Sequence, residues 1–92
     1  MEAVRWRMTF RIRSQTAATL SPLVLRPWWS AFPDQPGILL TDGSLLLVTE
    51  VQARDAHHAL LLGRYRVTEF FPGPGYRLES LTLYQEYWQE YW

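Results

Sequence analysis

Four arginines near the beginning of the chain form the pattern that most strongly suggests ligand binding. They are Arg5, Arg7, Arg11 and Arg13. On a β-strand, side chains two residues apart lie on one face about 6.6 Å from each other, so the row would form a basic stripe able to follow a phosphate backbone. The row is also stable without any ligand, because two unit charges about 7 Å apart repel by only about 0.6 kcal/mol in water.

The charge balance of the chain favours internal pairing of these arginines. All nine basic residues are arginine, nine residues are acidic, and the formal net charge is zero. Residues 1–30 hold five arginines and Glu2, and residues 31–92 hold four arginines and eight acidic residues. We expect Glu50, Glu69 and Glu79, in neighbouring predicted strands, to pair with the arginines across the sheet. Nucleic-acid binding by the arginine row is therefore the alternative hypothesis.

The second feature with binding potential is the aromatic C-terminal segment. From Leu81 onward, the apolar residues follow a helical spacing and glutamine and glutamate occupy the other side, which predicts an amphipathic helix with Ser80 near its cap. Its aromatic residues are Tyr84, Tyr87, Trp88, Tyr91 and Trp92. Exposed, this stripe would mark an interface, where tyrosine and tryptophan dominate the binding energy. Packing of the helix on its own sheet is the alternative.

No combination of residues indicates catalysis. The chain has no cysteine, which excludes disulfides and thiolate chemistry. His57 and His58 are adjacent, so on a helix they would point about 100° apart and could not readily share a metal ion. The Pro-Gly-Pro-Gly turn at 72–75 lacks the backbone donors of a phosphate-binding loop. We expect a protein that is not an enzyme, with no catalytic residue, no metal and no cofactor.

Length and composition indicate one small α+β domain spanning residues 1–92, because 48% of the residues are hydrophobic and only 20% are charged. The longest aliphatic run, residues 45–48, is too short to span a membrane, and the arginines interrupt any signal-peptide core. We expect a cytoplasmic protein with no membrane contact. The absence of lysine and asparagine is typical of a bacterial-type, G+C-rich coding composition.

The first 37 residues contain one clear element and one ambiguous segment. Over residues 4–13, apolar and polar residues alternate with a period of two, which predicts a strand with one buried face. Residues 14–37 could form a loop or short helices. Ser14 could cap a turn that ends before Pro22, and Pro27 could begin a short helix.

A hairpin is predicted around Asp42-Gly43, which suits a two-residue type I′ turn between strands over 38–41 and 44–52. That register opposes Leu39 to Leu46 and places both, with Val48, on one face. The opposite face of the hairpin is also apolar. We therefore expect a second layer or another subunit to cover the face that carries Leu39, Leu46 and Val48.

The remaining segments complete the predicted sheet. Asp55 is expected to cap a helix of about two turns that Gly63 ends. Residues 66–71 and 76–78 are predicted strands that could pair with each other. The element order resembles a split βαβ arrangement, with short helices covering one face of about four antiparallel strands.

These patterns together favour a non-catalytic module that associates with itself as a C2 dimer, the commonest symmetry of soluble oligomers. Association with another protein is a further possibility. The predicted interface combines one hairpin face with the aromatic tail: Leu39, Leu46, Val48, Tyr84, Tyr87, Trp88, Tyr91 and Trp92.

Overall fold

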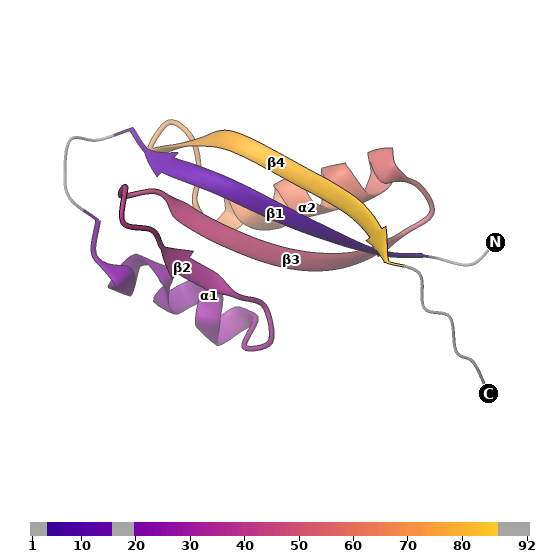
Figure 1. Ribbon diagram of the computed structural model, residues 1–92, viewed down its shortest axis with the longest axis horizontal. Coiled ribbons are helices and arrows are strands. Elements are labelled where there is room, and N and C mark those ends of the chain that lie inside the picture. Colours follow the sequence, from indigo (N-terminus) through magenta and orange to yellow (C-terminus); the bar gives the residue numbers. More distant parts are fainter. Residues whose placement is uncertain (1–3, 16–19, 87–92) are drawn as a thin grey trace.

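The computed structural model describes residues 4–15 and 20–86, which form a four-stranded sheet and three helical elements (Figure 1). The strands are β1 (Val4–Ser14), β2 (Gly37–Leu39), β3 (Leu45–Ala53) and β4 (Tyr76–Glu86). The helical elements are the 3-10 helix η1 (Pro22–Leu25) and the α-helices α1 (Arg26–Ala31) and α2 (Ala56–Phe70). The predicted α+β domain with four antiparallel strands is confirmed.

The sheet order β2-β3-β1-β4 places β1 and β3 in the middle. The chain passes from β1 to β2 through η1 and α1, and β3 lies between these two strands. It passes from β3 to β4 through α2, and β1 lies between those two. Each crossover thus spans an intervening antiparallel strand, which is the split βαβ arrangement that the element order resembles.

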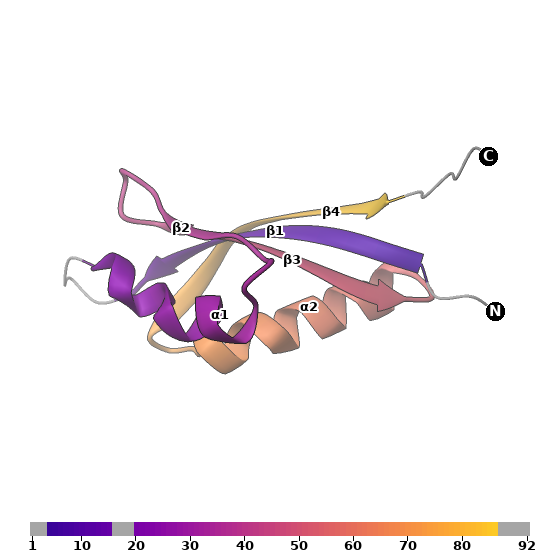
Figure 2. The ribbon, with the colours of Figure 1, turned by 90° about the horizontal axis from the view of Figure 1, so that it is seen from below.

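Both α-helices lie on the same face of the sheet (Figure 2). The hydrophobic core lies between these helices and the sheet. It follows the alternation of β1, in which Met8, Phe10 and Ile12 are at most 2% exposed. β3 buries alternate residues in the same way, beginning with Leu45 and Leu47. No element of the described residues covers the other face of the sheet.

The proline-rich connection forms the short helix predicted at Pro27. Trp28 of α1 is fully buried, and its indole N–H donates a 3.1 Å hydrogen bond to the carbonyl oxygen of Gln35. Its ring centroid lies 4.9 Å from that of Phe32 and 5.5 Å from that of Phe70 in α2. α1 is therefore held by one large buried side chain. Part of the possible turn after Ser14 lies outside the described residues.

The loop between β2 and β3 comprises residues 41–43 and is one residue longer than predicted. Gly43 has φ +87°, the left-handed conformation that a three-residue hairpin loop needs at its last position. Leu39 consequently lies opposite Leu45, one position away from the predicted register. Because a shift of one residue reverses a strand's faces, Leu39 packs against the core, whereas Ile38 is 49% exposed on the other side.

Helix α2 has 15 residues and is about twice as long as predicted. Asp55 caps it as expected, because its carboxylate accepts a 2.8 Å hydrogen bond from the N–H of His58. Gly63 does not end the helix, and the predicted strand over 66–71, with its pairing to 76–78, is wrong. The buried residues of α2 are Ala59, Gly63 and Val67, four residues apart on one stripe.

Gly63 is required by close packing and not by a turn. A Cβ atom at this position would lie 2.2 Å from Cε of Met8 and 3.2 Å from Cζ of Phe10. A glycine inside a helix costs about 1 kcal/mol relative to alanine. This cost is offset by the close packing of α2 on β1 that the missing side chain allows.

Arg66 of α2 donates hydrogen bonds to the part of the β3 edge that the short strand β2 does not reach. Its Nη1 donates to the carbonyl oxygen of Glu50 (2.9 Å) and to Oγ1 of Thr49 (2.8 Å). The fully buried Thr49 hydroxyl donates to Oε1 of Gln35 at 2.6 Å. The Arg66 guanidinium also lies 4.7 Å from the ring centroid of Phe32. One side chain thus joins α2, β3 and the loop after α1.

The segment predicted as a C-terminal helix continues as a strand over residues 81–86, so that part of the prediction is wrong. Leu81 and Leu83 pack against the core, whereas Thr82 and Tyr84 are exposed, which is a period of two. β1 offers a free edge whose N–H and C=O groups need partners, and pairing with it outweighs the local helical pattern. The remaining residues, 87–92, lie outside the described part of the chain.

We expect Gly63→Ala to destabilise the wild-type protein and to stabilise a Met8→Ala variant. In the wild type, the added methyl group overlaps the Met8 side chain, and overpacking of this kind costs roughly 1–3 kcal/mol. With Met8 shortened, the remaining close contact is with Cζ of Phe10 at 3.2 Å, which a small movement of that ring relieves, and alanine's helix propensity contributes about 1 kcal/mol. Urea unfolding of the wild type, both single variants and the double variant measures the two signs. A stabilising Gly63→Ala in the wild type would contradict the close approach.

Candidate functional site: the open face of the sheet

The face of the sheet away from the helices, called the open face below, gathers charged and apolar side chains from all four strands. The register places Arg7 of β1 between Glu50 of β3 and Tyr84 of β4. The arginine row lies on this face because its members alternate with the buried residues of β1. Other described members are Ile38 from β2, Thr9 from β1, Leu46 and Val48 from β3, and Thr82 from β4.

The arginines of the row are paired with carboxylates. Nη2 of Arg7 lies 2.9 Å from Oε1 of Glu50, whose other oxygen lies 3.9 Å from Nε of Arg5. Nε of Arg13 lies 2.7 Å from Oε1 of Glu79. The predicted pairing of the row with Glu50 and Glu79 is therefore confirmed. The paired side chains are about one-third exposed, so each ion pair contributes little to stability. Their main effect is to lower the net positive charge of the face.

Asp42, in the loop between β2 and β3, is the acceptor at the other end of the row. It pairs with Arg11, and its Oδ2 lies 3.4 Å from Nη2 of Arg13. The hydroxyl and the backbone N–H of Ser44 both donate to Oδ1 of Asp42. These hydrogen bonds from Ser44, and then the Arg11 guanidinium, hold the pKa of Asp42 well below its usual range.

Apolar side chains occupy the space between these charges. Ile38 is 49% exposed and Tyr84 is 44% exposed. Val48 and Tyr84 line a hollow of about 570 Å³ beside the Arg7–Glu50 pair. The open face thus combines exposed apolar and aromatic groups with four arginines whose charge three carboxylates largely offset.

The predicted interface residues divide into three groups. Leu46 and Val48 lie on the open face, both half-buried. Tyr84 also lies there, although on strand β4 and not on a helix. The prediction that Leu39 shares this face is wrong, because the longer hairpin loop turns its side chain to the core. The other predicted residues, Tyr87, Trp88, Tyr91 and Trp92, lie outside the described residues.

Sequence reasoning missed Asp42 as a partner of the arginines, because Asp-Gly was interpreted only as a turn. The excess of acidic residues after residue 30 was the available signal. Glu69 lies on α2 and not on a strand, so the expectation that it pairs across the sheet is wrong.

His57 and His58 are exposed at the start of α2. Among the side chains described in residues 4–15 and 20–85, no three His, Asp or Glu are grouped as metal ligands would be.

Comparison with known proteins gives no assignment for this fold and surface: no protein-family model, no curated protein and no solved structure matches the chain. In the described part of the chain, no helix has the length and apolar character needed to cross a membrane.

We expect Asp42→Asn to reduce the loss of stability at acidic pH. The pKa of Asp42 is lower in the folded protein than the value of about 3.9 in an unfolded chain. The stabilisation from the charged carboxylate is therefore complete above about pH 5 and is lost as the pH falls below about 4. Urea-unfolding midpoints measured between pH 6 and pH 2 should fall more steeply for the wild type. Ser44→Ala, which removes only one donor, should lie between the two, and parallel profiles for all three proteins would refute the assignment.

Proposed function

We propose that this protein is a non-catalytic association module that binds a second copy of itself through the open face. The observation that carries the proposal is the combination of Ile38, Leu46, Val48 and Tyr84 on a sheet face that the two α-helices leave uncovered. Antiparallel sheets often have one solvated face, but such a face is usually polar. Exposed apolar groups beside arginine and tyrosine are typical of binding surfaces.

The charge of the open face supports self-association. A C2 interface brings a surface against a copy of itself, so an unbalanced row of arginines would meet a like-charged row. Asp42, Glu50 and Glu79 balance most of the charge of the row. Because three carboxylates offset the four arginines of the row, the face can bury its apolar side chains against its own copy with less repulsion than an unbalanced row would cause.

The size of the face predicts a weak dimer. β1 and β4 each have 11 residues, or roughly 36 Å at about 3.3 Å per residue. Three long strands about 4.8 Å apart are roughly 14 Å wide, which gives a flat area of roughly 500 Å². The smaller specific interfaces bury about 600 Å² per partner. Side chains that stand out from the sheet add to the flat area, so we expect a dimer in equilibrium with its monomer.

The alternative prediction, nucleic-acid binding through the arginine row, concerns the same face. Phosphate contacts would have to compete with the carboxylates that already bind the guanidinium groups. Binding of that kind weakens steeply as the salt concentration rises, because counterions are released. Apolar self-association persists in salt, so the two hypotheses are experimentally distinct.

We expect the wild-type mass in light scattering to rise with protein concentration from 10.9 kDa towards twice that value, at both low and high salt. Val48→Glu places a carboxylate in the centre of the face and in its two-fold copy, and should keep the protein monomeric. Leu61→Glu is the matched control, because Leu61 is 54% exposed on α2, away from the open face.

A wild-type protein that stays monomeric at the highest concentration overturns the proposal. So does dissociation by Leu61→Glu to the same extent as by Val48→Glu. If the monomer instead binds an oligonucleotide at low salt with a change in tryptophan fluorescence, and releases it at high salt, the alternative replaces the proposal.

A further inference from the structure

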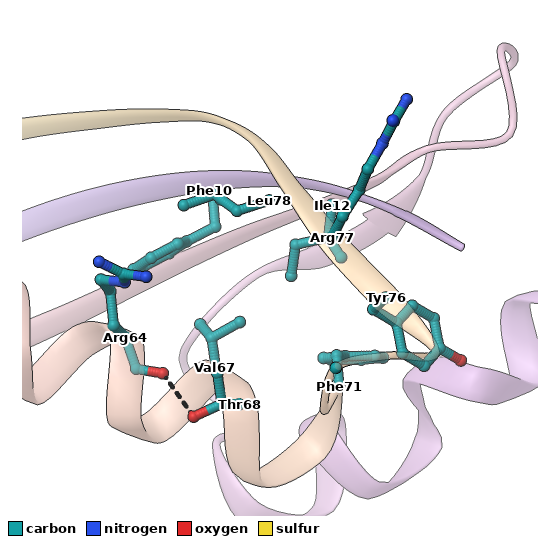
Figure 3. Close-up of a pocket in the computed structure, with 10 residues that line it drawn as sticks. Phe10, Ile12, Arg64, Val67, Thr68, Phe71, Tyr76, Arg77 and Leu78 are labelled. Carbon is teal, nitrogen blue, oxygen red and sulfur yellow. Dashed lines mark hydrogen bonds between the residues drawn. The ribbon is translucent and has the colours of Figure 1, made fainter. Parts of the chain in front are cut away.

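A second candidate site lies between α2 and β4, on the helical side of the sheet. It is a cavity of about 180 Å³ with predominantly apolar walls (Figure 3). Phe10 and Ile12 form the sheet wall, Val67 and Phe71 the helix wall, and Tyr76 and Leu78 the wall from β4. None of these residues belongs to the open face, so this site is independent of the proposed dimer.

The cavity results from the way β4 joins the sheet. The register between β1 and β4 shifts between Arg11 and Ile12, so the first residues of β4 are displaced along β1. Leu78 lies opposite Ile12, yet Leu78 is 42% exposed whereas Ile12 is 2% exposed. α2 therefore covers β1 here and leaves the neighbouring apolar wall of β4 accessible.

Two aromatic rings close one end of the cavity. The ring centroids of Phe71 and Tyr76 are 5.2 Å apart with an interplanar angle of 83°, an edge-to-face arrangement. The backbone of Gly73 in the turn between them also lines the cavity. The contact between Phe71 and Tyr76 thus holds the walls at this end of the cavity in place.

Arg64 provides a positive charge at the other end. Its side chain rises from α2 towards the sheet beside Phe10 (Figure 3). The residues that line the cavity include no acidic side chain, and no carboxylate described in residues 4–15 or 20–85 forms an ion pair with Arg64. Arg77 also borders the cavity, but its guanidinium points away from it (Figure 3). Arg64 therefore differs from the paired arginines of the open face.

We infer that this cavity binds a small monocarboxylate with a compact apolar body, such as a single aromatic ring on a short acid chain. The guanidinium of Arg64 presents two parallel N–H donors to a carboxylate, a bidentate geometry stronger than a neutral hydrogen bond. The volume suits one ring, because an apolar protein cavity of about 150 Å³ holds benzene. The ring would lie between Phe10, Val67 and Phe71, with the carboxylate at the mouth.

Three compounds separate the contributions of charge and apolar body. Phenylacetate has both, phenylacetamide keeps the shape without the charge, and acetate keeps the charge without the ring. We expect phenylacetate to bind at least about tenfold more tightly than either of the others, because a hydrogen bond to a charged group and the buried ring each add affinity. Chemical shifts of the methyl groups of Ile12, Val67 and Leu78 in the full-length protein report binding at this cavity.

The matched variants are Arg64→Gln, which removes the charge at the mouth, and Arg54→Gln, which removes an exposed arginine that does not line the cavity. Arg64→Gln should weaken phenylacetate binding about tenfold or more, whereas Arg54→Gln should leave it unchanged. Three results overturn the inference: no methyl shift at millimolar phenylacetate, equal binding of phenylacetate and phenylacetamide, or equal weakening by both variants. The dimer test on Val48 is unaffected by any of them.

Discussion

The alternation of buried and exposed residues along strand β1 sets the arrangement of the other elements. β1 is paired with β3 on one edge and with β4 on the other, so its two faces determine the faces of both neighbours. Met8 and Phe10 receive α2 at Gly63, and the arginines are placed on the opposite side. A shift of one residue would bring the arginine row against α2 and bury charges without partners, which is strongly unfavourable.

This division gives the molecule two surfaces of different chemistry. On the open face, carboxylates from β3, β4 and the hairpin loop balance the arginines, and apolar groups lie between the pairs. On the helical side, α2 covers the centre of the sheet but leaves a cavity against β4 with Arg64 at its mouth. Arginines are thus held in ion pairs on one side, whereas Arg64 on the other side has no carboxylate partner among the described side chains. The proposed self-association concerns the first surface, and the inferred carboxylate site concerns the second.

Most of the interpretations that were confirmed depend on short-range physics. The period of two in β1, the cap at Asp55 and the helix at Pro27 each follow from a few neighbouring residues. Two of the wrong predictions, at Gly63 and over residues 81–86, required knowledge of a distant partner. Locally, Gly63 indicates a helix end. Its role in the fold is close contact with Met8, a residue 55 positions earlier in the sequence. Residues 81–86 were predicted as a helix because their pairing with β1 cannot be seen locally.

The fold class, the buried face of β1 and the acidic partners Glu50 and Glu79 of its arginines could be predicted from the order of the residues, because alternation and charge balance are properties of the chain. The packed fold was needed to show that Asp42 is a further partner, which face Leu39 occupies and where a cavity remains. The hairpin register depends on a loop conformation at Gly43, and the cavity depends on a strand shift beside Ile12. Both are set by the fit between elements that no local pattern encodes.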